Sequence, residues 1–478
     1  MFWTLYRKEI KLSLRSTRFV LALAIIMAAF ALSGIMGSAS YHNQLAEFRQ
    51  RDAEATRNLM DQMGNLSGVA ALPQPALLPP SPYPYIRDLS STRLPERIVV
   101  NATRHREMEK AMRSNPLLNA GETFTWEFIL AMAGGFIAIL LSYDSIAEER
   151  RQGTISLIFS NPLTRWRVIT AKLLALVTIN AALVASGMLL SMLILAFTDV
   201  PILAGDAPLT MVIFFALSIL YLAFVTALGI FISTLTRTPS LALTALFFIW
   251  VAFSLVLPSA ARVTAGALER IPTPDERERA SDQVIGEIME ENNRTRPVVN
   301  GSTIVNYSRI PFTAVETHVA NGYLKVYEAL RRLQGEYEEQ LFDQGGFGLD
   351  LARWSPVELF RESSAKLTGS DIERWRRFLD EVENYRKELG AAIRALDSRD
   401  PGSPHVYFVT DINIWLSQRP VEDVAQIPRF GFKELPLAQR LGEALQPAAW
   451  LILWTTIIVL LAVIAFLRAD VRQKHVGS

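Results

Sequence analysis

The chain has 478 residues, of which 50% are hydrophobic and 20% are charged, and its formal net charge is +1. This near-neutral balance gives no electrostatic basis for a nucleic-acid partner, and the absence of cysteine excludes disulfide and thiolate chemistry. The apolar residues gather in long blocks rather than recurring at core-like intervals, which disfavours a set of soluble domains and predicts a membrane protein.

Residues 1–18 are predicted to form a cytoplasmic amphipathic helix at the membrane interface. The two sides of its helical wheel carry, respectively, Phe2, Trp3, Tyr6, Ile10 and Leu14, and Lys8, Lys11, Arg15 and Arg18. Such a helix places its aromatic residues among the lipid headgroups. An ordinary basic anchor for the first span is an equally good interpretation.

Six apolar blocks are long enough to cross a hydrocarbon core, which requires about 20 helical residues. These predicted transmembrane helices are 19–38, 124–143, 170–198, 209–232, 240–261 and 447–467. We interpret the first as an uncleaved span rather than a signal peptide, because the basic segment before it is long and patterned. The fold class is therefore an α-helical membrane protein with six transmembrane helices.

The ionisable residues associated with these blocks lie near their ends, as Glu127, Asp144 and Lys172 do. Inside the blocks the polar residues are Ser, Thr and Asn, including Asn180 and Thr226, which suit packing between helices. An ion-coupled transporter generally places ionisable groups within its spans. The dipeptide Gly-Lys of a nucleotide-binding loop is also absent, so energy for transport would come from another chain.

The distribution of basic residues predicts the orientation of the spans. Lys and Arg gather before the first span, between the second and third, and after the last, and Arg237 lies between the fourth and fifth. Residues 198–209 contain Asp199 and Asp206 and no basic residue. Both termini, including the tail 468–478, are therefore expected in the cytoplasm. The chain would lie in the cytoplasmic (inner) membrane, with residues 39–122 and 262–446 outside.

The two outer segments differ in composition. The first combines a charged, helix-permissive run with a proline-rich stretch around residues 72–85, which favours an extended spacer. The second is expected to be an α-rich mixed domain, with amphipathic helices at 323–342 and 371–396 and a strand-like run at 405–416. The glycine cluster 345–348 is expected to form a turn.

No catalytic or metal-binding constellation is visible in the sequence. The five histidines are widely separated, and neither an HExxH nor a GxSxG motif is present. The chain is therefore expected to be non-catalytic and to bind no cofactor of its own. A membrane-bound hydrolase that uses the outer domain is a weaker alternative.

The connection between the second and third blocks, residues 143–172, is unusually elaborate. The second helix is expected to continue through Asp144 to Arg151, where Gly153 breaks it. A short helix then starts at a Thr154 cap, carries Leu157, Ile158 and Phe159, and ends at Asn161 and Pro162, before Arg165 opens the next helix. This short helix could bind a cytosolic partner or could simply lie under the bilayer.

The same connection resembles the first cytoplasmic loop of ABC-2 type transporter permeases, especially the branch of the nitrous-oxide-reductase maturation and gliding-motility permeases. The matching residues are Asp144, Ile146, Glu149, Gly153, Thr154, Ile158, Ser160, Asn161, Pro162, Arg165 and Lys172, with Ile158 in place of the usual leucine. A second likeness covers Trp354 to Leu379, which resembles a segment of the large outer loops. Most of 40–122 and 262–350 matches no motif.

The resemblance implies an ABC-2 type permease fold and the permease subunit of an exporter. It also implies that this subunit docks a separate ABC ATPase subunit, which binds ATP and Mg²⁺. It also implies a second permease copy or a sister permease. Residues 154–159 would be the coupling helix, with Leu157, Ile158 and Phe159 at its apolar centre. Glu148, Glu149, Arg150 and Arg151 would form a salt-sensitive rim. The alternative is a membrane-anchored scaffold or assembly factor whose outer domains bind extracytoplasmic partners.

Overall fold

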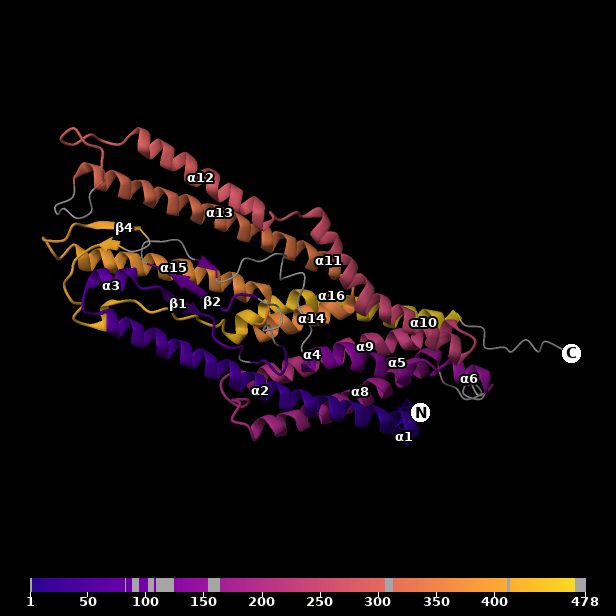
Figure 1. The fold of residues 1–478 in the computed structure, drawn as a ribbon. Helices are drawn as coiled ribbons and strands as arrows, with labels where there is room; N and C mark the ends of the chain where they lie inside the picture. Colours follow the sequence, from indigo (N-terminus) through magenta and orange to yellow (C-terminus); the bar gives the residue numbers. More distant parts are fainter. Residues whose placement is uncertain are drawn as a thin grey trace.

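The computed structural model describes residues 2–81, 83–87, 94–101, 107–108, 124–153, 164–305, 313–410 and 413–468. The molecule is elongated (Figure 1). Helices α1 (Phe2–Leu14) and α6 (Ala147–Arg151) lie at one end, which we call the basal end. The opposite part, which we call the distal domain, contains the strands and helices α3, α12, α13 and α15.

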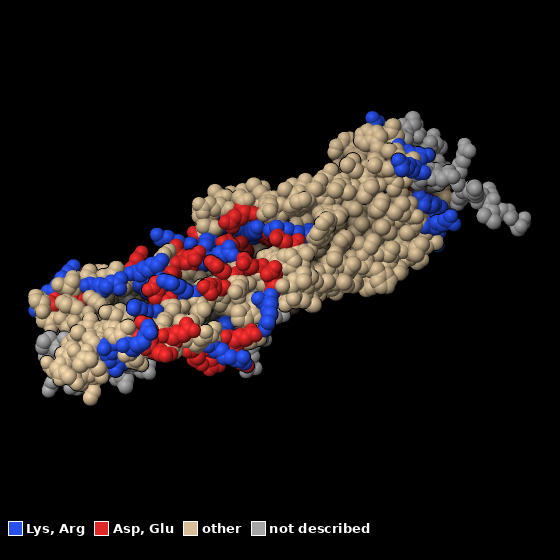
Figure 2. Space-filling view, turned by 90° about the horizontal axis from the view of Figure 1, so that it is seen from above, with Lys and Arg blue, Asp and Glu red and all other residues tan. Residues whose placement is uncertain are grey.

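Six helical segments of the described chain are long and apolar enough to cross a membrane, which confirms the predicted number of spans. They are Thr17–Gln62, Trp126–Arg151, Arg165–Ala196, Ala207–Leu235, Pro239–Leu268 and Leu437–Arg468. On the face shown in Figure 2, the acidic side chains are confined to the distal half, and an almost uncharged band follows. Beyond that band the charged residues visible at the far end are basic. The chain is thus an α-helical, multi-pass membrane protein.

The first span belongs to one continuous helix, α2 (Thr17–Gln62), which extends far beyond the predicted boundary at residue 38. Ser16 caps it, because its hydroxyl accepts a hydrogen bond from the Phe19 amide at 3.2 Å. At 1.5 Å per residue, a helix of 46 residues is about 69 Å long, roughly twice the thickness of a hydrocarbon core. Helix α2 therefore connects the membrane part directly with the distal domain.

Two spans contain a π-helical turn. The second span consists of α4 (Trp126–Ile129), the π-turn η2 (Leu130–Gly134), α5 (Gly135–Ser142) and, after a turn at 143–146, α6. The fifth consists of α10 (Pro239–Val251), the π-turn η3 (Ala252–Val256) and α11 (Leu257–Leu268). In each π-turn a neighbouring side chain donates to a backbone carbonyl: Tyr221 to Ala131 at 2.9 Å, and Ser355 to Phe253 at 2.6 Å. Inserted side chains of this kind disturb the regular helical ladder.

The remaining spans are α8 (Arg165–Ala196), α9 (Ala207–Leu235) and α16 (Leu437–Arg468). Between α9 and α16 lies a helix that the sequence did not reveal as part of the bundle, α14 (Pro356–Thr368). Its Phe360 is fully buried and stacks on Tyr221, with ring centroids 4.9 Å apart. Gly369, in the left-handed conformation at φ 63°, ends the helix. The segment between the fifth and sixth spans thus returns into the bundle.

The two predicted outer segments form one distal domain with a shared core. Leu59, Leu66 and Ile98 come from the first segment and pack in the same cluster as Trp375 and Phe378 from the second. The helices are α3 (Leu66–Ala71), α12 (Pro274–Arg294), α13 (Ala314–Ala352) and α15 (Ile372–Asp397), with the short 3₁₀ helix η4 (Val424–Gln426). The α-rich mixed composition agrees with the prediction.

Two small antiparallel sheets complete the distal domain. One has the order β1 (Gln74–Leu77), β2 (Arg97–Val100), β3 (Glu107–Met108), and the other pairs β4 (Val406–Thr410) with β5 (Asn413–Trp415). The first predicted amphipathic helix lies within α13, the second agrees with α15 to within one residue at each end, and the strand-like run forms the β4–β5 pair. Part of the proline-rich stretch pairs as β1. The predicted turn at 345–348 is wrong, because these residues continue α13, and Gly345 and Gly348 are buried there.

Candidate functional site

A buried lysine joins three elements at the basal end. The side chain of Lys172 on α8 is only 4% exposed, and its Nζ donates to Glu9 Oε1 of α1 at 3.0 Å and to Glu149 Oε1 of α6 at 2.8 Å. A buried ammonium group is tolerated only when it is paired and hydrogen-bonded. Lys172 therefore holds the N-terminal helix and α6 against the same point of the third span.

Further contacts seat α1 and α2 at this end. The Tyr6 hydroxyl is hydrogen-bonded to Thr178 Oγ1 of α8 at 3.0 Å, and Leu5 is buried. Arg18, at the start of α2, donates to Asp144 Oδ2 at 2.5 Å, and its guanidinium lies 5.0 Å from the centre of the Tyr143 ring. The predicted helix at the N-terminus is thus present and packs against α8 along one side.

Helix α6 is fastened to the end of α9 by backbone capping. Ser233 Oγ accepts from the amides of Ile146 and Ala147 at 3.1 and 3.0 Å. Arg150 donates to the carbonyls of Thr236 and Thr234 at 3.1 and 3.0 Å. The last carbonyls of a helix lack intrahelical partners and carry partial negative charge, so a guanidinium is a favourable cap. These bonds make α6 and the end of α9 one unit.

Arg165 similarly caps a helix end: at the start of α8, its Nη1 donates to the carbonyl of Leu467 at 2.8 Å, near the end of α16.

Glu148 and Arg151 pair with each other on the surface of α6, with two bonds of 2.7 and 2.9 Å. Gly153 has φ +70°, a conformation that other L-residues rarely adopt, so the chain turns away from α6 there. Thr154, Leu157, Ile158, Phe159, Asn161 and Pro162 lie outside the described residues.

The structure therefore divides the predicted site residues into two groups. Glu149 and Arg150 point to partners within their own chain, whereas Glu148 and Arg151 remain on the surface. The sequence analysis did not predict that Glu9 pairs with Lys172. A signal was available, because Glu9 is the one acidic residue in the otherwise basic sequence of α1.

A second group of charged residues joins the distal domain to the opposite end of the bundle. Glu127 of α4 is 5% exposed and pairs with Arg87 at 2.5 Å and with Arg361 of α14 at 3.3 Å. Asp206, before α9, accepts from Tyr83 at 2.5 Å and pairs with Arg440 of α16. Within the bundle, Asn180 donates to Thr226 at 3.1 Å, as expected for polar residues that pack helices together.

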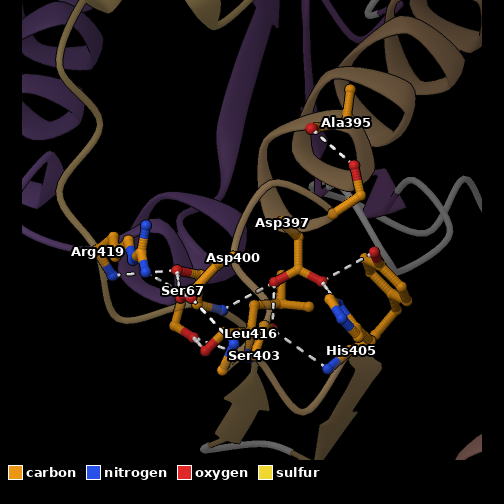
Figure 3. Close-up of polar contacts among 12 residues, drawn as sticks. Ser67, Ala395, Asp397, Asp400, Ser403, His405, Leu416 and Arg419 are labelled. Carbon is orange, nitrogen blue, oxygen red and sulfur yellow. Dashed lines mark hydrogen bonds and ion pairs between the residues drawn. The ribbon is translucent and has the colours of Figure 1, made fainter.

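The distal domain contains a serine, a histidine and an aspartate in proximity (Figure 3). Buried Asp397 accepts from Ser403, from His405 Nδ1 at 2.7 Å, from Tyr407 at 3.0 Å and from the Ser417 amide at 2.9 Å. Burial raises the pKa of Asp397, but these hydrogen bonds outweigh it and the pKa is lowered. Because Ser403 donates to the aspartate and not to the imidazole, the cluster lacks the geometry of a nucleophilic triad. It holds the loop after α15 in place.

Among the described residues, no group of three or more His, Cys, Asp or Glu side chains is arranged to hold a metal ion. A family model described as an ABC-2 family transporter protein matches residues 3–471. The match covers nearly the whole chain, including the distal domain for which the sequence offered few motifs. The curated proteins include no significant match.

Proposed function

The chain belongs to the ABC-2 transporter family, and from this premise we propose that it is the permease subunit of an ATP-driven exporter. In this proposal a separate ABC ATPase subunit binds ATP and Mg²⁺ and docks at the basal end. The chain contributes the pathway and the contact surface but no catalysis. A second copy, or a sister permease, completes the pathway.

The observation that carries this proposal is the attachment of α6. The segment 154–163 follows α6 after two residues, Gln152 and Gly153. Helix α6 is bonded to α8 through Glu149 and Lys172 and to α9 through Arg150 and Ser233. A displacement of that segment by a docked ATPase would thus reach two spans through short polar bonds. In this arrangement Glu149 and Arg150 position the contact, and Glu148 and Arg151 form its charged rim.

The docking test is co-purification of the chain with its ATPase from mild detergent. We expect a stoichiometric ATPase subunit with the wild type and its loss with Phe159→Asp, because a carboxylate in the apolar centre of the contact would be desolvated. Ile304→Asp is the matched control, since Ile304 is 79% exposed in the distal part of the chain. Absence of any ATPase from the wild-type preparation would favour a membrane-anchored scaffold.

We further propose that the basal end faces the cytoplasm and that the membrane is the cytoplasmic (inner) membrane, with the distal domain outside. Basic residues near the spans gather at the basal end, as in cytoplasmic loops. Because the chain has no cysteine, a single introduced cysteine is a unique label. We expect a membrane-impermeant maleimide to label Gly286→Cys in intact cells and Thr4→Cys only after permeabilisation. The reverse pattern would refute the orientation.

A further inference from the structure

Helix α1 has two faces that differ in chemistry. Its packed face carries Leu5, Tyr6 and Glu9 towards α8. Its other face is exposed and forms a shallow groove of about 570 Å³ lined mainly by Trp3, Arg7, Lys8, Lys11, Leu12 and Arg15. Trp3, which the helical wheel grouped with Tyr6, is 63% exposed and stands at the edge of this groove.

The charge on the exposed face has a single sign. Four cationic side chains line the groove, and Glu9, the acidic residue of α1, is directed away from it to Lys172. Arg7, Lys11 and Arg15 follow one another at intervals of four residues, about one helical turn, and therefore form one row. Lys8 stands beside this row. Such a surface is complementary to an anion.

The position of the groove identifies the anion. Helix α1 is followed at Thr17 by α2, which contains the first membrane span. The groove therefore lies next to the end of that span. Trp3 and Leu12 stand exposed beside the cations, which is the combination found where headgroups meet acyl chains. An acidic protein partner or a free phosphate would leave this apolar pair without a function.

We propose that the exposed face of α1 is a binding site for anionic phospholipid headgroups, and that its occupancy tunes the contact with the ATPase. The second part rests on the proposed function. The linkage is physical, because α1 and α6 share Lys172, and α6 leads into the segment proposed to dock the ATPase. Lipid that holds α1 in place keeps Glu9 on Lys172 and so stabilises the seated position of α6.

The binding test does not need the ATPase. The full chain is reconstituted in phosphatidylcholine, and electron paramagnetic resonance measures the motionally restricted fraction of nitroxide-labelled phosphatidylglycerol and phosphatidylcholine. Each basic side chain near an anionic membrane surface contributes about fivefold to association, which corresponds to about 1 kcal/mol. We expect a several-fold preference for phosphatidylglycerol in the wild type and none in the triple variant Arg7→Gln, Lys11→Gln, Arg15→Gln.

The matched control removes the same charge from exposed distal arginines, Arg49→Gln, Arg57→Gln and Arg279→Gln, and retains the preference. Equal binding of both lipids by the wild type overturns the proposal, as does a preference that survives in the triple variant or disappears in the control. A wild type that binds a soluble acidic peptide as well as it binds phosphatidylglycerol also overturns it, in favour of a protein partner.

The tuning test measures ATP hydrolysis by the reconstituted complex as phosphatidylglycerol replaces phosphatidylcholine. We expect the wild-type rate to rise and that of the triple variant to stay flat. Glu9→Gln should keep the lipid preference but lose the rise in rate, because it breaks the link to Lys172 without changing the groove. A rise equal to wild type in Glu9→Gln overturns the linkage. If no ATPase docks to the wild type, the proposed function fails, and the resonance measurement still decides the lipid site.

Discussion

Replacement of Lys172 by methionine tests the buried ion pairs of Lys172 with Glu9 and Glu149 at the basal end. Methionine has a similar length and packs easily, so Lys172→Met removes the charge with little change in volume. It leaves Glu9 and Glu149 facing each other, with side chains 18% and 20% exposed, without the ammonium that neutralised them. Two carboxylates in this position repel each other and lose their shared donor.

The magnitude follows from the burial of the three groups. Breaking a fully buried ion pair by removal of one partner costs about 3–5 kcal/mol. Because both carboxylates keep some access to water, we expect a loss below that range, about 2–3 kcal/mol of unfolding free energy. The assay is equilibrium unfolding of the full-length protein in mixed micelles with increasing denaturing detergent.

A matched variant separates the charge from the packing. The combination Lys172→Met, Glu9→Gln and Glu149→Gln keeps the shape and removes all three charges, so it should recover most of the lost stability. Docking of the ATPase should still be weaker in this variant, because the strong link between α6 and α8 is gone. If the unfolding free energy of Lys172→Met lay within about 0.5 kcal/mol of wild type, Lys172 would not hold α1 and α6 against α8 as assigned.

Four further changes test other parts of the structure by the same unfolding measurement. Gly229→Ala should destabilise the bundle by about 1–3 kcal/mol, because the added Cβ would overlap Ser142 Oγ. The control Gly286→Ala, on exposed α12, should be neutral or stabilising. Equal changes in stability for the two variants would contradict the close approach of α5 and α9. Tyr221→Phe should cost about 1 kcal/mol and increase amide exchange around η2, since it removes the bond to Ala131; unchanged exchange would mean that the π-turn forms without it. Burial raises the pKa of Asp371 to about 6, so this carboxyl binds a proton more tightly in the folded than in the unfolded protein. Its contribution to stability therefore falls as pH rises from about 4 to 6. Asp371→Asn keeps an N-cap acceptor and should remove this pH dependence. Burial raises the pKa of Glu383, but hydrogen bonds from Arg386 and Arg331 outweigh burial and lower the pKa to about 2. Its contribution to stability is therefore present above about pH 4.5 and is lost as pH falls towards 2, so Glu383→Gln should lower stability at neutral pH. If stability changed with pH in the same direction for Asp371 and Glu383, these two environments would be refuted.

The features that could be predicted from the sequence are those encoded locally. Each span is a long run of mostly apolar residues, so its existence depends on the length of that run and on no distant partner. The amphipathic period of α1 is equally local, and the motif around Asp144, Gly153 and Arg165 carried the family resemblance, which the match over residues 3–471 confirms. The sequence did not show that the first span and the charged run after residue 38 form one helix, because both segments are good helix formers and no local signal indicates that α2 continues without a break.

The tertiary structure alone decided which distant residues meet. Residues 345–348 continue α13 despite the low helix propensity of glycine, since packing of the buried Gly345 and Gly348 outweighs a cost of about 1 kcal/mol per glycine. The two outer segments share one core because Ile98 and Trp375 lie in the same cluster, a contact that no local pattern encodes. Lys172 near a span end could be read from the sequence, but its partners Glu9 and Glu149 could not. A buried charge requires a counter-charge, and the fold determines which residue supplies it.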